Sequence, residues 1–187
     1  MKKKIINISK IITFDKDSDM LNIFDKPEVL IQNNKIVQIN EKVEECDEII
    51  NAEGCMLTPG FIDSHSHPVF IGDRSNEFKM RFEGKTYKEI SDMGGGIISS
   101  IKMLRNSSDD ELYEATFNNI KPFIYNGTTT LEAKSGYGLT IEDEIRSLEM
   151  LQKLNNVLDI DIVPTFLGAH AVPPEHSKSD YINIICN

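Results

Sequence analysis

Basic side chains, cysteine and long apolar runs are all scarce in this sequence. Lysine and arginine number 20 against 30 acidic residues, which leaves a formal net charge of -10 at pH 7. Such a charge repels nucleic-acid backbones and anionic membrane surfaces. No stretch approaches the roughly 18 consecutive apolar residues that a membrane span needs. We therefore predict a soluble globular protein that has neither nucleic acid nor a membrane as its partner.

The three cysteines, Cys46, Cys55 and Cys186, are odd in number and far apart in the chain. This pattern is typical of reduced thiols rather than of a disulfide framework, and it favours a cytoplasmic protein. Cys55 is a conceivable metal ligand, but we expect a buried structural thiol. The start Met-Lys-Lys-Lys resembles that of a signal peptide, yet polar residues interrupt the apolar run behind it, so we predict no export signal.

The first part of the chain, residues 1–56, predicts a small β domain of the sandwich type. Apolar residues make up 40% of the chain, enough for a core, and 187 residues can hold one large or two small domains. The isoleucine-rich residues 5–14 predict one strand. Two further apolar segments flank Asn33 and Asn34, a pair that tolerates the positive φ angles of a tight hairpin turn. We see no chemistry in this part.

The second part, residues 57–187, alternates strands with helices. We expect strands that begin at Phe61, over residues 128–134 and over residues 161–167. We expect helices over residues 86–93, from Ser108 to Gly127 and from Thr140 onward. Pro122 should bend or shorten the second helix, and the third should bury Ile141, Ile145, Leu148 and Leu151. The three glycines at 94–96 predict a mobile loop or a close approach of backbone to a ligand.

Two histidines, His65 and His67, follow the first apolar strand of the second part. Side chains alternate along a strand, so both imidazoles point to one face, about 7 Å apart. That spacing lets both nitrogens reach one divalent ion at roughly 2.0–2.1 Å. The alternative is a pair of exposed strand histidines. Because the chain has only four histidines, we favour the metal site.

Polar groups with catalytic potential follow each predicted strand. Arg74 comes after the histidine pair, Tyr137 after the second strand and His170 after the third. Chemistry at the carboxyl ends of strands that alternate with helices is typical of a (β/α) barrel or a doubly wound sheet. We therefore expect these groups on one rim. His176, among prolines, is interpreted as loop surface.

With these residues in place, the chain resembles the amidohydrolase superfamily, and within it the imidazolonepropionase family. The segments that carry the resemblance are Thr58-Pro-Gly-Phe-Ile-Asp-Ser-His-Ser-His67, Gly72-Asp-Arg-Ser-Asn-Glu-Phe78, Gly94-Gly-Gly-Ile97, Glu132-Ala-Lys-Ser-Gly-Tyr-Gly-Leu139 and Pro164-Thr-Phe-Leu-Gly-Ala-His170. The His-x-His element indicates only the superfamily. The Lys-Ser-Gly-Tyr-Gly and Phe-Leu-Gly-Ala-His segments are far more specific.

The resemblance implies a cytoplasmic metal-dependent hydrolase of histidine degradation. His65 and His67 would bind one zinc or iron ion, and Arg74, Tyr137 and His170 would contact the substrate, 4-imidazolone-5-propanoate, whose ring is opened to N-formimidoyl-L-glutamate. A guanidinium can grip the propanoate through two parallel hydrogen bonds. The alternatives from the residues alone are a surface salt bridge for Arg74, a partly buried aromatic for Tyr137 and a structural hydrogen bond for His170. The resemblance also allows a homodimer.

The resemblance implies a fold that this chain does not complete. A (β/α)8 barrel needs about 250 residues, whereas residues 57–187 provide the first three strand-helix units. In the family, a further histidine, an aspartate and the general base come from later strands, so we expect the 187-residue chain alone to be inactive. Another cyclic amidohydrolase or a deaminase is one alternative function. The other is a non-catalytic carboxylate-binding module completed by a partner chain.

Overall fold

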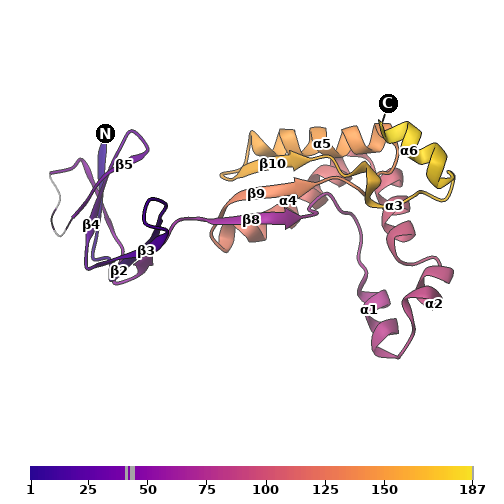
Figure 1. The fold of residues 1–187 in the computed structure, drawn as a ribbon, viewed down its shortest axis with the longest axis horizontal. Coiled ribbons are helices and arrows are strands. Elements are labelled where there is room, and N and C mark those ends of the chain that lie inside the picture. Colours follow the sequence, from indigo (N-terminus) through magenta and orange to yellow (C-terminus); the bar gives the residue numbers. More distant parts are fainter. Residues whose placement is uncertain (41, 43–44, 187) are drawn as a thin grey trace. The chain divides into compact units, whose positions relative to one another are not determined.

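The computed structural model describes residues 1–40, 42 and 45–186 and shows a mixed α/β protein (Figure 1). The chain divides into two compact units, Met1–Pro59 and Gly60–Asn187. The regular elements described in the first unit are all strands, and the second unit carries a parallel sheet with helices. Each unit is described by itself below.

The first unit consists of two sheets. Strands β5 (Lys35–Asn40), β4 (Glu28–Gln32), β1 (Lys2–Ile6) and β6 (Glu48–Asn51) form one sheet in that order, and β3 (Met20–Asp25), β2 (Lys10–Asp15) and β7 (Met56–Leu57) form the other. The predicted hairpin is confirmed, because β4 and β5 pair antiparallel around Asn33 and Asn34, whose φ angles are 51° and 60°.

The single strand predicted over residues 5–14 is wrong. The chain forms β1 and β2 instead, and these strands belong to different sheets. Asn7 lies between them with a φ of 57°, a left-handed conformation that ends the extended run. Ile8 and Ile11 are nevertheless buried and pack with Val29. The apolar pattern therefore identified a core but not the turn inside it.

The second unit is built on three parallel strands in the order β10-β9-β8. Strand β8 spans Phe61–Ser66, β9 spans Thr128–Lys134 and β10 spans Asp161–Thr165. The connections contain α1 (Ser75–Phe82), α2 (Tyr87–Asp92), α3 (Ile97–Asn106), α4 (Asp109–Tyr125) and α5 (Ile141–Asn155), and the 3-10 turn η1 (Gly168–His170) and α6 (Lys178–Cys186) follow β10. Because the strands are parallel, their carboxyl ends share one edge of the sheet.

Side-chain caps begin three of these helices as the sequence indicates. Thr86 and Ser108 form capping boxes with Glu89 and Glu111, and the hydroxyl of Thr140 accepts a hydrogen bond from the Asp143 amide. Pro122 does not cut α4 short, since the helix continues to Tyr125.

Helix α3 was not predicted from the sequence. The glycines at 94–96 connect α2 to α3, and Gly96 lies immediately before α3 with a φ of 72° and a ψ of -153°. Only glycine adopts this conformation readily. The segment predicted as a mobile loop or a close approach of backbone to a ligand is thus a short connection between two helices.

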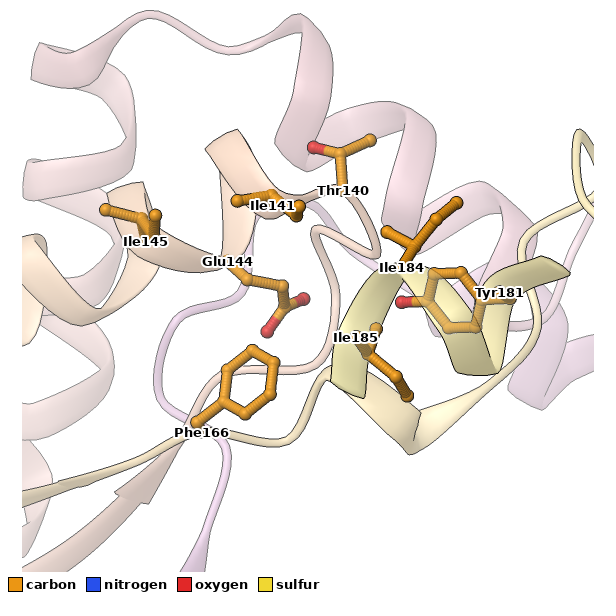
Figure 2. Close-up of a pocket in the computed structure, with 8 residues that line it drawn as sticks. All are labelled: Thr140, Ile141, Glu144, Ile145, Phe166, Tyr181, Ile184 and Ile185. Carbon is orange, nitrogen blue, oxygen red and sulfur yellow. The ribbon is translucent and has the colours of Figure 1, made fainter. Parts of the chain in front are cut away.

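The buried face predicted for helix α5 is right for Leu151, which is fully buried, and wrong for the first turns of the helix; Leu148 is half-buried. Ile141 and Ile145 were expected to be buried but are 52% and 50% exposed, and they lie beside a surface pocket (Figure 2). Glu144 and Ser147 occupy the buried positions one turn apart, and Leu151 and Leu154 continue that face. Because a carboxylate and a hydroxyl are buried in the first turns, the buried face of α5 differs there from the face that its apolar residues indicate.

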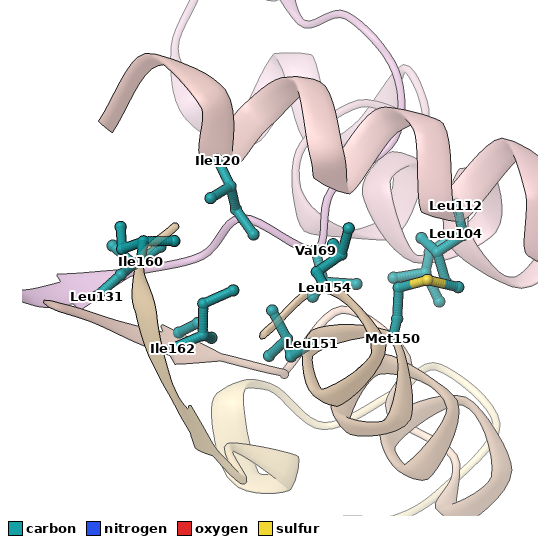
Figure 3. Packing of buried hydrophobic residues seen from close by; sticks show 11 residues of the cluster. Val69, Leu104, Leu112, Ile120, Leu131, Met150, Leu151, Leu154, Ile160 and Ile162 are labelled. Atoms are coloured by element: carbon teal, nitrogen blue, oxygen red, sulfur yellow. The ribbon is translucent and has the colours of Figure 1, made fainter. Parts of the chain in front are cut away.

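The main core lies between helices α4 and α5 and one face of the sheet (Figure 3). Its buried members come from α3, α4, α5, strands β9 and β10 and the segments next to β8 and β10. They are Val69, Leu104, Leu112, Ile120, Leu131, Ala133, Met150, Leu151, Leu154, Ile160 and Ile162. Leu131 and Ala133 of β9 point into this core. Because side chains alternate along a strand, Glu132 and Lys134 point to the opposite face of the sheet.

Within the described residues, no helix combines the length and the apolar character that crossing a membrane requires.

Candidate functional site

His65 lies in strand β8 and His67 directly follows the strand, and the two side chains lie on one side. Ser66, the last residue of β8, is buried and pairs with Ala133, and its hydroxyl donates a 2.7 Å hydrogen bond to the Glu132 carbonyl. With Ser66 facing the core, the side chains on either side of it, His65 and His67, face the other way. Their ring centroids are 5.5 Å apart. The predicted shared orientation of the imidazoles agrees with this arrangement.

His67 lies at the centre of a group of aromatic rings. The ring of His170 stacks on it with 5.0 Å between centroids, and the ring of Tyr137 lies 5.7 Å away. Tyr137 and His170 also contact each other, at 5.3 Å. The rings come from the carboxyl ends of β8, β9 and β10, so three segments far apart in sequence meet at one edge of the sheet.

A backbone contact orients His170. Its Nδ1 lies 2.8 Å from the carbonyl oxygen of Gly136. A carbonyl can only accept, so Nδ1 carries the proton, and a neutral His170 has its lone pair on Nε2. Gly136 has a φ of 110°, and a Cβ there would come within 3.0 Å of the His170 Nδ1. Glycine is therefore needed at position 136 to let the ring approach.

The imidazole of His67 has the properties of a metal ligand. Burial, followed by the nearby His170, His65 and Lys134, lowers the pKa of His67 below its ordinary value of 6.5. The ring is therefore neutral near pH 7, the form in which imidazole binds metals. Its Nδ1 is buried and has no hydrogen-bond partner. A buried nitrogen of this kind needs a partner, and a cation would supply one.

The set of ligands within the described residues is small. No group of three or more histidine, cysteine, aspartate or glutamate side chains there has the arrangement to hold a metal ion. Cys55 was expected to be buried, which is wrong, since it is an exposed free thiol of the first unit. Cys46 and Cys186 are also free, as predicted. The histidine pair is thus the strongest metal-binding feature of the described chain.

Arg74 lies just before α1 and is held by Glu77. Its Nε and Nη2 donate to the same carboxylate oxygen of Glu77 at 3.1 and 2.5 Å, and the other oxygen accepts from the Gly96 amide at 2.9 Å. The hydrogen bond from Arg74 lowers the pKa of the Glu77 carboxyl. The ion pair that was the alternative interpretation of Arg74 is therefore present, and substrate binding by this side chain stays a prediction.

Three residues that fix the site were missed by sequence reasoning. Asn119 of α4 donates to the carbonyls of Pro68 and Phe70, at 3.0 and 2.9 Å, and so holds the backbone behind His67. Glu144 accepts from the amides of Gly138 and Leu139, and Arg105 donates to the Gly138 carbonyl at 2.7 Å. Asn119 carried the only usable signal, since asparagine is unfavourable inside a helix unless its amide is engaged.

His176 lies outside the group of rings. It is exposed, as predicted, in the turn before α6, and its ring stacks on Tyr181 with 6.1 Å between centroids. Only three of the four histidines are therefore brought together.

Solved structures with similar folds include a chlorohydrolase and a deaminase. A mutant of atrazine chlorohydrolase from Arthrobacter aurescens TC1, complexed with zinc and atraton, matches with a TM-score of 0.57 and 16% identity over 87% of this chain and 35% of its own. Guanine deaminase from C. acetobutylicum with bound guanine matches with a TM-score of 0.54 and 20% identity over 88% of this chain and 36% of its own. At these identities the likeness shows the fold alone.

The sequence comparisons are more specific. No model of a protein family matches the chain. Imidazolonepropionase from Geobacillus kaustophilus is 42% identical over 183 residues, which cover 91% of this chain and 43% of the relative. The enzyme from Aliivibrio fischeri is 37% identical over all of this chain and 48% of its own length. The chain thus spans less than half the length of these curated relatives. It is a homologue of the N-terminal portion of the imidazolonepropionases.

Proposed function

We propose that this chain forms the N-terminal part of a metal-dependent imidazolonepropionase. The reaction is hydrolysis of a ring C–N bond of 4-imidazolone-5-propanoate to give N-formimidoyl-L-glutamate. The observation that carries the proposal is the meeting of His65, His67, Tyr137 and His170 at the strand ends of a homologue of these enzymes. In this proposal residues 1–56 form the small β domain, and residues 57–187 form the first three units of a (β/α)8 barrel.

His65 and His67 are the proposed ligands of one zinc or iron ion. Two observations support the fit: the neutral form of His67 and its buried Nδ1 without a partner. A divalent ion bound there would act as a Lewis acid toward the substrate carbonyl and would favour ionisation of water. The protein's part is to hold both rings on one side of β8, which the buried Ser66 achieves.

Arg74, Tyr137 and His170 are the proposed substrate contacts. Arg74 binds the propanoate carboxylate, with Glu77 fixing the guanidinium from behind. The Tyr137 hydroxyl donates a hydrogen bond to the substrate ring or to the propanoate carboxylate. His170 donates from Nε2 to the ring carbonyl only as the imidazolium, because its Nδ1 proton is already directed at the Gly136 carbonyl.

The remaining ligands and the general base are proposed to lie on later strands of the barrel. The described residues contain no group of three or more metal-binding side chains, which supports this division. We therefore propose that the 187-residue chain alone binds substrate without turnover. A cytoplasmic location and a homodimeric assembly complete the proposal.

The test is a chimera in which residues 1–187 replace the matching part of the Geobacillus kaustophilus enzyme. We expect it to open imidazolonepropanoate and to leave hydantoin and amino-substituted heterocycles unchanged. Turnover of those compounds instead would support another cyclic amidohydrolase or a deaminase. A folded chimera that binds imidazolonepropanoate but converts nothing would support the non-catalytic carboxylate-binding module.

Arginine variants of the same chimera test the substrate contact. Arg74→Lys should raise KM by about tenfold to a hundredfold, because lysine cannot replace two parallel charged hydrogen bonds. Arg81→Lys is the matched control, since Arg81 lies in helix α1, which begins directly after Arg74, and its side chain is exposed and lies over the Tyr87 ring. Equal KM values for the two variants would show that Arg74 does not bind the substrate.

A further inference from the structure

A pocket in the Gly60–Asn187 unit is lined by none of the four rings described above. It is formed by the start of α5, the residue after β10 and helix α6, and its volume is about 330 Å³ (Figure 2). Its walls are mostly apolar and include Ile141, Ile145, Phe166 and Ile184. Ile141, Ile145 and Phe166 are each about half exposed, so the pocket opens to solvent.

One carboxylate in this pocket is incompletely paired. Glu144 is 2% exposed, and its Oε1 accepts from the Gly138 and Leu139 amides at 2.9 and 2.8 Å. Its Oε2 is buried and has no hydrogen-bond partner. Figure 2 shows the carboxylate pointing into the space between Phe166 and Ile185. A buried carboxylate oxygen is costly unless a donor reaches it.

Two polar side chains near Glu144 make hydrogen bonds to other groups. The Tyr181 hydroxyl donates to the Gly168 carbonyl at 2.6 Å. Arg105 donates through Nε to the Gly138 carbonyl and through Nη1 to Glu175, while its Nη2 is buried without a partner. None of these hydrogen bonds reaches Oε2 of Glu144, and the pocket beside it is lined mostly by apolar side chains and aromatic rings. Such a combination suits a small cation with an alkyl chain, because the ring faces attract positive charge.

We propose that this pocket binds a small primary alkylammonium ion. The ammonium donates to Oε2 of Glu144, and the alkyl chain lies against Ile141, Ile145 and Ile184. Phe166 and Tyr181 offer their rings to the charge. The proposal is independent of the proposed function. The pocket connects to the group of rings through Glu144, which holds the amides next to Tyr137, and through Tyr181, which donates to the Gly168 carbonyl in the turn that carries His170.

The experiment uses the 187-residue chain, labelled with 15N, and butylammonium as the probe. We expect saturable shifts of the Gly138 and Leu139 amide resonances, since these amides share the carboxylate with the ligand. Butanol, which has the same chain without the charge, should bind at least about tenfold more weakly. Equal binding of butanol, or the absence of a saturable shift at these amides, would overturn the proposal.

Two variants locate the site. Glu144→Gln keeps an oxygen for the amides but removes the charge, and it should weaken butylammonium by about tenfold or more. Ile141→Lys tethers an ammonium one turn before Glu144, so it should fill the site and abolish binding, whereas Ile141→Leu should not. Unchanged binding to a folded Ile141→Lys chain would refute the site even if the glutamine variant failed to fold. No step measures catalysis, so failure here is separate from failure of the proposed function.

Discussion

Removal of the Asn119 side chain tests how the site is anchored to the fold. This amide donates to two carbonyls, those of Pro68 and Phe70, at 3.0 and 2.9 Å, directly behind His67. Each hydrogen bond contributes about 1 kcal/mol to the free energy of unfolding. Asn119→Ala should therefore destabilise the second unit by about 2 kcal/mol, close to a thirtyfold change in the unfolding equilibrium.

Asn118→Ala is the matched control for this prediction. Asn118 precedes Asn119 in α4 and is exposed, so both variants gain the same helix propensity but only one loses the two bonds. The assay is urea unfolding followed by far-ultraviolet circular dichroism, with the imidazole resonances of His67 as a local probe. We expect a difference of about 2 kcal/mol between the variants and a shift of the His67 resonances in Asn119→Ala alone. Equal stabilities within about 0.5 kcal/mol would refute the reasoning.

Three further substitutions have expected outcomes. Leu154→Ala opens a cavity at a fully buried position and should cost about 2–5 kcal/mol in urea unfolding, and a loss below about 1 kcal/mol would contradict the described core. Glu77→Gln tests pH dependence: the hydrogen bond from Arg74 lowers the pKa of Glu77, so its stabilisation is present above the unfolded value of 4.5 and is lost as pH falls through the folded value. Stability measured from pH 7 downward should therefore decline less steeply in Glu77→Gln, and parallel curves would count against the ion pair. Gly96→Ala forces a side chain into a φ of 72° with the Tyr87 hydroxyl 3.2 Å away, and it should lower stability by about 1–3 kcal/mol in thermal unfolding, whereas an unchanged midpoint would argue against this backbone conformation.

The sequence predicted correctly those elements whose conformation depends on a few neighbouring residues. The threonines and apolar residues of 128–134 predicted β9 at its observed bounds, and the caps at Ser108 and Thr140 predicted the starts of α4 and α5. Asn33 and Asn34 predicted the hairpin. In each case the conformation depends on neighbours within a few residues.

The failures have tertiary causes. Ile141 and Ile145 fit an apolar stripe, but Glu144 is buried instead because two backbone amides of the preceding loop bind it. The break between β1 and β2 depends on one left-handed asparagine, Asn7, inside an isoleucine-rich run. Helix α3 follows three glycines whose role as a connection is evident only once α2 and α3 are in place.

The candidate site was predictable to the extent that strand geometry determines it. Alternation along β8 and the common edge of parallel strands predicted that His65, His67, Arg74, Tyr137 and His170 would lie on one rim. The structure brings the rings of His65, His67, Tyr137 and His170 together. A surface salt bridge was the alternative prediction for Arg74, but its partner Glu77 was not predicted. The support from Asn119 was not predicted either, because it depends on where α4 lies against the segment after β8. The roles of these residues in metal and substrate binding stay predictions.

The central claim is that His65 and His67 share one divalent ion, and a Co²⁺ titration of the chain labelled with 15N at histidine tests it most directly. Cobalt is paramagnetic and broadens the resonances of nearby nuclei. We predict that the resonances of His65 and His67 broaden first and together, that those of His170 follow, and that exposed His176 changes last. Broadening of His176 at the same Co²⁺ concentration as His67 would contradict the claim. So would broadening of His170 at an unchanged Co²⁺ concentration in the His65→Ala, His67→Ala double variant.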